Sequence, residues 1–162
     1  MDILDCTSRG DFSGVQKLLN ESKYLVHTKD KFGWEPLHEA VANGYSTITE
    51  ILLKAGANIE SPDIAERRPL HLAVMCGSLE TVIMLTHYRA DIEAKINGNW
   101  TPLYYAVVLK NIDVIRHLIL QGANVKDYYG KEDLMDIMNE NISDSEADEI
   151  MCRYLRNVRR RQ

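Results

Sequence analysis

A phrase of five residues that begins with proline recurs in this chain at intervals of 33 residues. Its copies read Pro36-Leu37-His38-Glu39-Ala40, Pro69-Leu70-His71-Leu72-Ala73 and Pro102-Leu103-Tyr104-Tyr105-Ala106. A fixed period of this length indicates one supersecondary unit copied along the chain, and such units bury a shared core when they stack. The function of the chain is therefore expected on a surface rather than in a catalytic cleft.

Each copy has the pattern of two short helices. Thr101 can cap a first helix while Pro102 occupies its first turn, where the missing N–H of proline would have had no partner. Gly44 and Gly77 fall at the expected ends of the first helices, and glycine accepts the left-handed conformation that helix ends commonly require. The second helices show helical apolar spacing, as in Ile48, Ile51, Leu52 and Leu53 and again in Val114, Ile115, Leu118 and Ile119.

The repeated unit resembles the ankyrin repeat. The residues that carry the resemblance are Gly33, Pro36, Leu37, His38, Ala40, Gly44, Leu52, Leu53, Gly56, Ala57 and Asn58. The resemblance implies an all-α repeat solenoid of stacked helix-turn-helix units with short β-hairpin loops. It implies a single domain over residues 1–162, with repeats at about 1–30, 31–62, 63–95 and 96–127 and a degenerate C-terminal cap at 128–162.

Several positions depart from the repeat pattern. Glu35 and Arg68 stand where Thr101 precedes proline in the later copy, which we interpret as drift that a cooperative stack tolerates. Lys110 and Arg89 occupy positions that are glycine in other copies, where a left-handed backbone costs a non-glycine residue about 1 kcal/mol. We expect the turn at Arg89 to be the least regular of the turns that follow the second helices.

Composition favours a globular protein without general affinity for nucleic acid. The 162 residues are 45% hydrophobic and 27% charged, and the formal net charge is −5. A negative charge argues against phosphate-backbone binding, which needs Lys and Arg to displace counterions. The cysteines fit neither a disulfide framework nor a Cys-x-x-Cys metal pattern, so we expect reduced thiols. We expect no membrane span, no cofactor and a cytoplasmic monomer, with the nucleus as the alternative location.

The histidines and acidic residues show no catalytic or metal-binding pattern. His38 and His71 lie one repeat apart, about 10 Å at ordinary helix spacing, which is too far to share a zinc ion with bonds of about 2 Å. We therefore interpret them as structural. No Ser/His/Asp arrangement or glycine-rich phosphate loop stands out in the sequence. We expect a protein that is not an enzyme and takes no metal and no small-molecule substrate.

The resemblance also implies where a partner binds. In ankyrin proteins the partner usually contacts the hairpin tips and the ends of the first helices. The matching residues, which we predict to bind a partner, are Lys31, Phe32, Trp34, Asn43, Ile64, Arg67, Met75, Cys76, Asn97, Trp100, Val108 and Leu109. Aromatic residues, Met and Arg are enriched at interface cores. The alternative is that Trp34 and Trp100 merely cover neighbouring loops, with Arg67 against an indole face.

The leading functional hypothesis is a protein–protein interaction module that acts as an adaptor, a scaffold or an inhibitor. The resemblance implies that it binds another protein through its hairpin tips and the concave face of its first helices. Two alternatives stay open. The first is contact with nucleic acid or an anionic surface through the arginine-rich end at Arg159, Arg160 and Arg161. The second is a host-directed effector of a microbe or virus that uses the same protein-binding surface.

Overall fold

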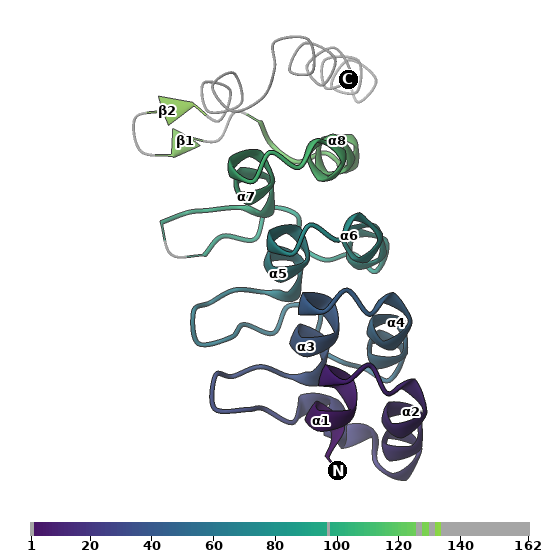
Figure 1. Cartoon of the computed structure of the whole chain (residues 1–162). Coiled ribbons are helices and arrows are strands. Elements are labelled where there is room, and N and C mark those ends of the chain that lie inside the picture. The colour runs from purple at the N-terminus through teal and green to yellow at the C-terminus, as the bar shows by residue number, and fades with distance from the viewer. Residues whose placement is uncertain (1, 97, 126–127, 130–131, 134–162) are drawn as a thin grey trace. The chain divides into compact units, whose positions relative to one another are not determined.

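The computed structural model describes residues 2–96, 98–125, 128–129 and 132–133. The chain divides into two compact units, Met1–Asp91 and Ile92–Gln162. Short helices and the loops between them make up most of the described residues (Figure 1). The fold is an all-α repeat solenoid, as expected.

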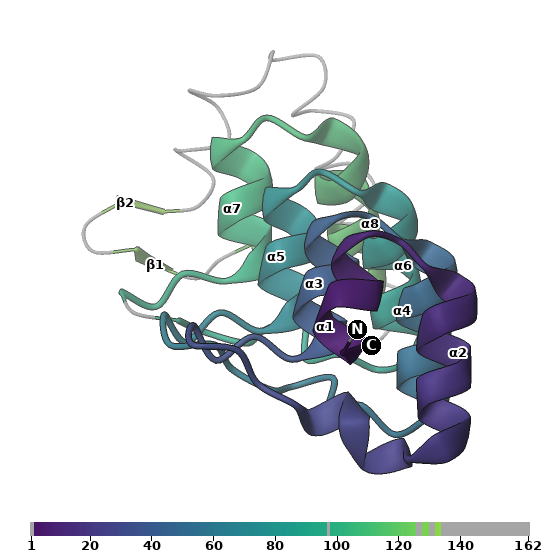
Figure 2. The same cartoon turned by 60° about the horizontal axis from the view of Figure 1, so that its bottom comes forward.

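The helices of the first unit form two rows (Figures 1 and 2). The row of first helices consists of α1 (Ile3–Ser8), α3 (Pro36–Ala42) and α5 (Pro69–Met75), and the row of second helices consists of α2 (Phe12–Glu21), α4 (Ser46–Lys54) and α6 (Leu79–His87). Within each row every helix contacts the next, α1 with α3 and α3 with α5, and α2 with α4 and α4 with α6. A short 3-10 helix, η1 (Lys23–His27), lies between α2 and α3 in the chain.

The repeat period is the period of the buried core. Leu37 and Leu70, which follow the repeated prolines Pro36 and Pro69, are fully buried, and so are Leu52 and Leu85 of the second helices. Burying a leucine side chain stabilises the folded state by about 1.5–3 kcal/mol relative to leaving it exposed. The 33-residue repetition seen in the sequence therefore places the same apolar side chain at the same depth in successive repeats.

The predicted helix boundaries of the first unit are confirmed. Pro36 and Pro69 are the first residues of α3 and α5. Gly44 and Gly77 follow these helices with φ angles of 70° and 71°, in the left-handed region. Glycine recurs at this position of the repeat because the backbone there is left-handed, a conformation that glycine adopts without penalty.

Within its described residues, the second unit holds one helical pair. It consists of α7 (Pro102–Val108) and α8 (Ile112–Gln121), which contact one another. The side chain of Thr101 accepts a hydrogen bond from the backbone N–H of Tyr104 at 3.3 Å, which confirms the predicted helix cap. The strands β1 (Tyr128–Tyr129) and β2 (Glu132–Asp133) pair antiparallel. The rest of the predicted C-terminal cap, with Arg159, Arg160 and Arg161, lies outside the described residues.

The expectation that the turn at Arg89 is the least regular is wrong. Its backbone N–H donates to the carbonyl of Thr86 at 3.0 Å, and the N–H of Gly56 makes the equivalent bond to Leu53 at 3.1 Å. Arg89 adopts the left-handed conformation with φ of 64°, as Lys110 does with φ of 56°. The strain of a non-glycine residue is small enough that the hydrogen bonds of the turn keep their geometry.

Arg68, at the position of the capping threonine, forms ion pairs with two acidic side chains. Its guanidinium donates to Glu60 at 2.7 Å and to Asp91 at 3.4 Å, and the backbone N–H of Asp91 donates to the other oxygen of Glu60 at 2.8 Å. An arginine in place of the capping threonine therefore joins two successive turns of the first unit. The interpretation as tolerated drift stays a prediction, and the ion pairs show which contacts Arg68 makes in place of a cap.

Glu35 forms a different set of contacts, in which only one of its two carboxylate oxygens has a hydrogen-bond partner. Its buried carboxylate accepts a hydrogen bond from the hydroxyl of Ser61 at 2.8 Å. His38 is fully buried beside it, where Nδ1 accepts from the backbone N–H of Glu35 at 3.0 Å and Nε2 donates to the carbonyl of Ser61 at 2.8 Å. His71 repeats the first of these bonds with the N–H of Arg68 at 3.3 Å. The prediction of structural histidines is confirmed.

Candidate partner-binding surface

The two loops of the first unit owe their shape to an aspartate at the start of each. Asp30 accepts hydrogen bonds from the backbone N–H groups of Phe32 and Trp34, both at 2.8 Å. Asp63 makes the same two bonds to the residues two and four positions further on, at 2.8 and 2.9 Å. Aspartate commonly organises turns in this way. We missed both residues in the sequence, although their 33-residue spacing was a signal that could have identified them.

A groove lies between these two loops. The backbone N–H of Ile64 donates to the carbonyl of Phe32 at 3.2 Å and so joins one loop to the next. The groove has a volume of about 500 Å³ and is called the loop groove below; its lining is Asp30, Phe32, Trp34, Glu39, Ile64, Ala65 and Arg67. Phe32 is 51% exposed and Ile64 is 72% exposed. The structure therefore brings four of the predicted residues, Phe32, Trp34, Ile64 and Arg67, to one site.

Trp34 has a structural role in this groove. Its side chain is half-buried and stacks on the ring of His38, with a centroid separation of 6.4 Å. Its indole Nε1 donates to Oδ2 of Asp63 at 3.1 Å. Because these contacts join Trp34 to the helix that follows it, α3, and to the next loop, they fit the alternative that the sequence left open, in which the tryptophan covers neighbouring loops.

Arg67 belongs to the same cluster. Its Nε and Nη2 atoms lie 2.8 and 2.7 Å from Oδ2 of Asp63, and its guanidinium lies 5.9 Å from the ring centroid of Trp34. Burial alone would raise the pKa of Asp63, but the hydrogen bonds and charge of Arg67 hold it below its usual value. The positive charge of Arg67 is thereby compensated inside the protein.

The remaining predicted residues of the first unit lie near the helix ends and loop tip. Asn43 and Cys76 cap the C-termini of α3 and α5, and Met75 is the last residue of α5; all three are exposed. Burial raises the pKa of the Cys76 thiol, while the charge of Arg67 lowers it, so the two side chains interact electrostatically. Lys31 extends over Phe32, with Nζ 4.9 Å from the ring centroid.

The second unit carries its own aromatic and apolar surface. Trp100 is 40% exposed and stacks on Tyr104 at a centroid distance of 5.4 Å, while Tyr105 meets its ring edgewise at 5.7 Å. Val108 and Leu109, at the end of α7, are also exposed. The last predicted site residue, Asn97, lies outside the described residues.

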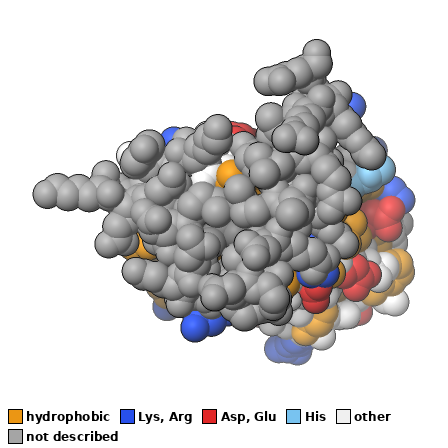
Figure 3. Space-filling model, turned by 90° about the horizontal axis from the view of Figure 1, so that it is seen from above, with side chains coloured by type: hydrophobic (Ala, Val, Ile, Leu, Met, Phe, Trp, Pro, Cys, Tyr) orange, Lys and Arg blue, Asp and Glu red, His pale blue; other side chains and the backbone are white. Residues whose placement is uncertain are grey.

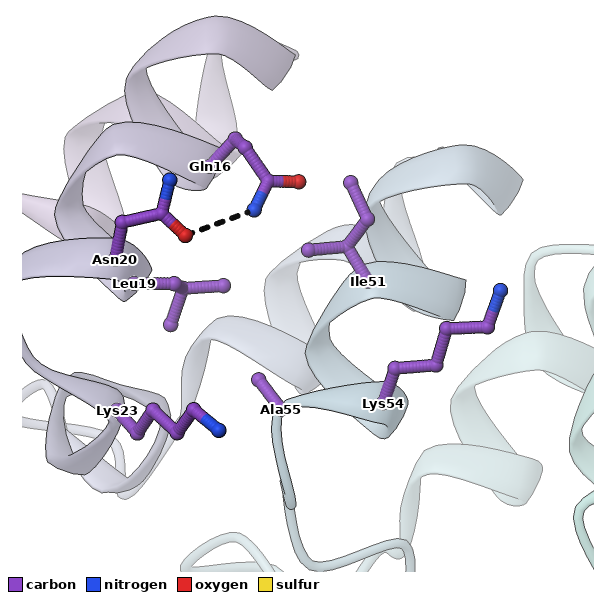
Figure 4. Close-up of a pocket in the computed structure, with 7 residues that line it drawn as sticks. All are labelled: Gln16, Leu19, Asn20, Lys23, Ile51, Lys54 and Ala55. Carbon is purple, nitrogen blue, oxygen red and sulfur yellow. Dashed lines mark hydrogen bonds between the residues drawn. The ribbon is translucent and has the colours of Figure 1, made fainter.

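A second pocket lies on the row of second helices (Figure 4). It measures about 250 Å³ and is lined by Gln16, Leu19, Asn20, Lys23, Ile51, Lys54 and Ala55. Gln16 donates to Asn20 at 3.3 Å, and Lys54 pairs with Glu50 at 2.7 Å. Figure 4 shows the side chain of Lys54 extending away from that of Lys23. Because most of its polar groups are engaged with neighbours, this pocket offers less to a partner than the loop groove.

Metal-binding clusters and membrane-spanning helices are both absent from the described part of the chain. There, His, Cys, Asp and Glu side chains do not gather in groups of three or more that could hold a metal ion. None of the helices described is both long enough and apolar enough to cross a bilayer.

Comparison with known proteins identifies the repeats. A family model described as ankyrin repeats in three copies matches residues 3–96, and a model of the single ankyrin repeat matches residues 98–129. A comparison with curated proteins gave no match. The two family matches cover most of the chain and agree with the predicted number of about four repeats. The chain therefore belongs to the ankyrin-repeat family.

Proposed function

We propose that this chain is a non-catalytic module that recognises another protein through the loop groove. Ankyrin repeats as a class are protein–protein interaction modules. The observation that carries the proposal is the exposure of two large apolar side chains, Phe32 and Ile64, on adjacent loops. Both side chains line the loop groove, and exposed apolar side chains that gather at one place are typical of interaction sites.

The construction of the loops supports recognition by a preformed surface. Asp30 and Asp63 hold the backbone of their loops through two hydrogen bonds each, and Ile64 is bonded to Phe32 across the loops. Side chains on a backbone fixed in this way lose less conformational freedom on binding. A partner held there would be masked or brought to a third protein, which are the actions of an inhibitor and of an adaptor or scaffold.

The second unit offers an additional contact surface. Trp100 and Leu109 combine a partly exposed indole with an exposed aliphatic side chain, and tryptophan is among the residues that dominate binding energy at interfaces. We infer that this surface contributes to the same partner or binds a second one.

Charge distribution supports a protein partner over a nucleic acid. The side chains coloured along the margin of Figure 3 include acidic, basic and apolar ones. Nucleic-acid-binding domains instead cluster Lys and Arg on one face. The formal net charge of −5 has the same consequence.

The proposal is tested by polar substitution at exposed positions that carry little of the fold. Phe32→Ser and Ile64→Ser remove the apolar side chains of the loop groove, and Ile83→Ser, on the exposed face of α6, is the matched control. Affinity capture from the native cell with each variant is expected to lose the same partner for both groove substitutions and to retain it for the control. Thermal unfolding curves should coincide for all three. Retention of every captured partner by the two groove variants would refute the proposed site.

A further inference from the structure

We propose that the loop groove accepts a protein segment in which an apolar side chain stands next to a lysine or arginine. This inference rests on the proposed function and adds the chemistry of the partner. It follows from two acidic side chains that line the groove and form no salt bridge with a cationic side chain among the described residues.

Of the charged side chains that line the loop groove, the basic one forms a salt bridge and the acidic ones form none among the described residues. Arg67 is the cation of the lining, and its charge is taken up by Asp63, with two nitrogens within 2.8 Å of the carboxylate. Asp30 and Glu39 also line the groove, and neither forms a salt bridge with a cationic side chain among the described residues. The groove therefore presents two carboxylates whose charge a bound segment has to match.

Both carboxylates are held in place without being neutralised. Asp30 accepts two backbone N–H groups of its own loop. Glu39 accepts a hydrogen bond from the side chain of Asn43 at 3.2 Å. Neutral donors orient a carboxylate and leave its charge, so each keeps its attraction for a cation.

The apolar part of the segment is placed by the exposed side chains. Phe32 and Ile64 come from adjacent loops and line the same groove as the two carboxylates. One face of Phe32 is occupied by the ammonium group of Lys31, 4.9 Å from the ring centroid. A second cation is repelled from that face and is directed to Asp30 and Glu39. The bound segment thus combines an apolar group for Phe32 and Ile64 with a cation for the carboxylates.

The test is selection of random peptides displayed on phage, carried out on the full chain and on variants. The wild-type chain should enrich peptides in which Leu, Ile, Phe or Met lies within two residues of Lys or Arg. Glu39→Lys should remove the enrichment of basic residues while keeping that of apolar ones. Ile64→Ser should remove both. Glu21→Gln, an exposed acid at the end of α2, should select the same peptides as the wild type.

A synthetic peptide with the selected sequence then gives the magnitude. Glu39→Gln keeps an oxygen for Asn43 and removes the charge, so it should weaken peptide binding about two- to fivefold, the range for one exposed ion pair. Binding should also weaken with added salt.

The possible results separate the two proposals. Enriched peptides that depend on Ile64 but are acidic or uncharged, or basic peptides that Glu39→Lys still selects, would overturn the partner chemistry and leave the proposed function standing. Enrichment that survives Ile64→Ser, or no enrichment by the wild-type chain, would overturn the loop groove as a peptide site.

Discussion

The indole of Trp34 donates a hydrogen bond to the buried carboxylate of Asp63, which lies in the next repeat, at 3.1 Å. The same carboxylate oxygen is bound by the guanidinium of Arg67. The buried carboxylate of Asp63 therefore joins two loops and holds Trp34 and Arg67, which line the loop groove, in place. This makes Trp34 a poor probe of partner binding, because its substitution also disturbs the scaffold.

Substitutions at Trp34, at Asp63 and at the control position Trp100 should lower the free energy of unfolding by different amounts. Trp34→Phe leaves Asp63 one donor short and should lower the free energy of unfolding by about 1–2 kcal/mol. Asp63→Ala leaves Arg67 without its buried partner and should lower it by about 3 kcal/mol or more. Trp100→Phe, at an exposed position, should change it by about 0.5 kcal/mol or less. Urea unfolding measures all three, and equal losses for Trp34→Phe and Trp100→Phe would contradict the assignment.

The two tryptophans should report different environments in fluorescence. Trp34 is half-buried and bonded to Asp63, whereas Trp100 is more exposed to water. The Trp100→Phe variant, which retains Trp34, is expected to emit at shorter wavelength and to be quenched less by iodide than the Trp34→Phe variant. The reverse order would contradict the greater exposure of the Trp100 side chain.

Stability should fall on mild acidification because of His38. Burial lowers the pKa of this side chain below its ordinary value of 6.5, and its Nδ1 accepts a hydrogen bond that the protonated ring cannot accept. Below pH 6.5 the unfolded chain binds a proton that the folded chain does not, so stability is full above that pH and declines as the pH falls toward the folded-state pKa. The decline is at most about 1.4 kcal/mol per pH unit for one group.

The contribution of His38 can be separated from that of other residues. Burial also lowers the pKa of His117 in the second unit, so the wild-type profile contains both groups. His38→Gln should reduce the dependence of urea stability on pH between 6.5 and 5, and the part that remains should contain the contribution of His117. An unchanged profile in His38→Gln would contradict the buried, neutral state of this ring.

Cys76 should react slowly with alkylating reagents in spite of its exposure. Burial around the sulfur raises the pKa of the thiol above its ordinary value of 9.0, and Arg67 partly opposes this shift. Cys6 is buried and Cys152 lies outside the described residues, so the measurement uses a Cys152→Ser background. There, the rate of reaction of Cys76 with iodoacetamide should still be increasing above pH 9. Arg67→Met should slow the reaction at neutral pH. A rate that levels off near pH 8 would contradict the predicted shift.

Relief of backbone strain should stabilise the chain at Arg89. Its φ of 64° lies in the region that glycine occupies freely. Arg89→Gly is expected to raise the free energy of unfolding by about 1 kcal/mol, whereas Arg89→Ala keeps the strain and should not. Comparing the two variants by urea unfolding removes any effect of the lost side chain. Equal stabilities would show that this turn stores no strain.

The sequence predicted the repeated part of the fold because residues with a structural reason for their position recur every 33 residues. Pro36 and Pro69 marked helix starts, and Gly44 and Gly77 marked helix ends, since each residue type has a backbone reason to be there. The partners of the residues that depart from the pattern could not be found in this way. Arg68 and Glu60 are not related by the repeat period, so their pairing appears only in three dimensions.

The predicted partner-binding set shows the same division. Exposure of Phe32 and Ile64 agrees with their place at the loop tips. Trp34 and Arg67 occupy the same region, but their contacts are made with the buried Asp63. The 33-residue period tells which residues occupy equivalent positions in the repeats. The direction of each side chain depends on the neighbouring groups with which it forms contacts.

The backbone of each loop in the first unit is shaped by its opening aspartate rather than by the residues at its tip. The tip position takes the left-handed conformation as Gly33 in one loop and as Glu66 in the other, with φ angles of 75° and 60°. Mutation can therefore replace Lys31 and Phe32, or Ile64 and Ala65, without redesigning the turn, whereas a side chain at Gly33 would strain the backbone and crowd Ile64. Loops of this construction allow recognition to diverge under selection, or in a designed library, while the helices that support them stay the same.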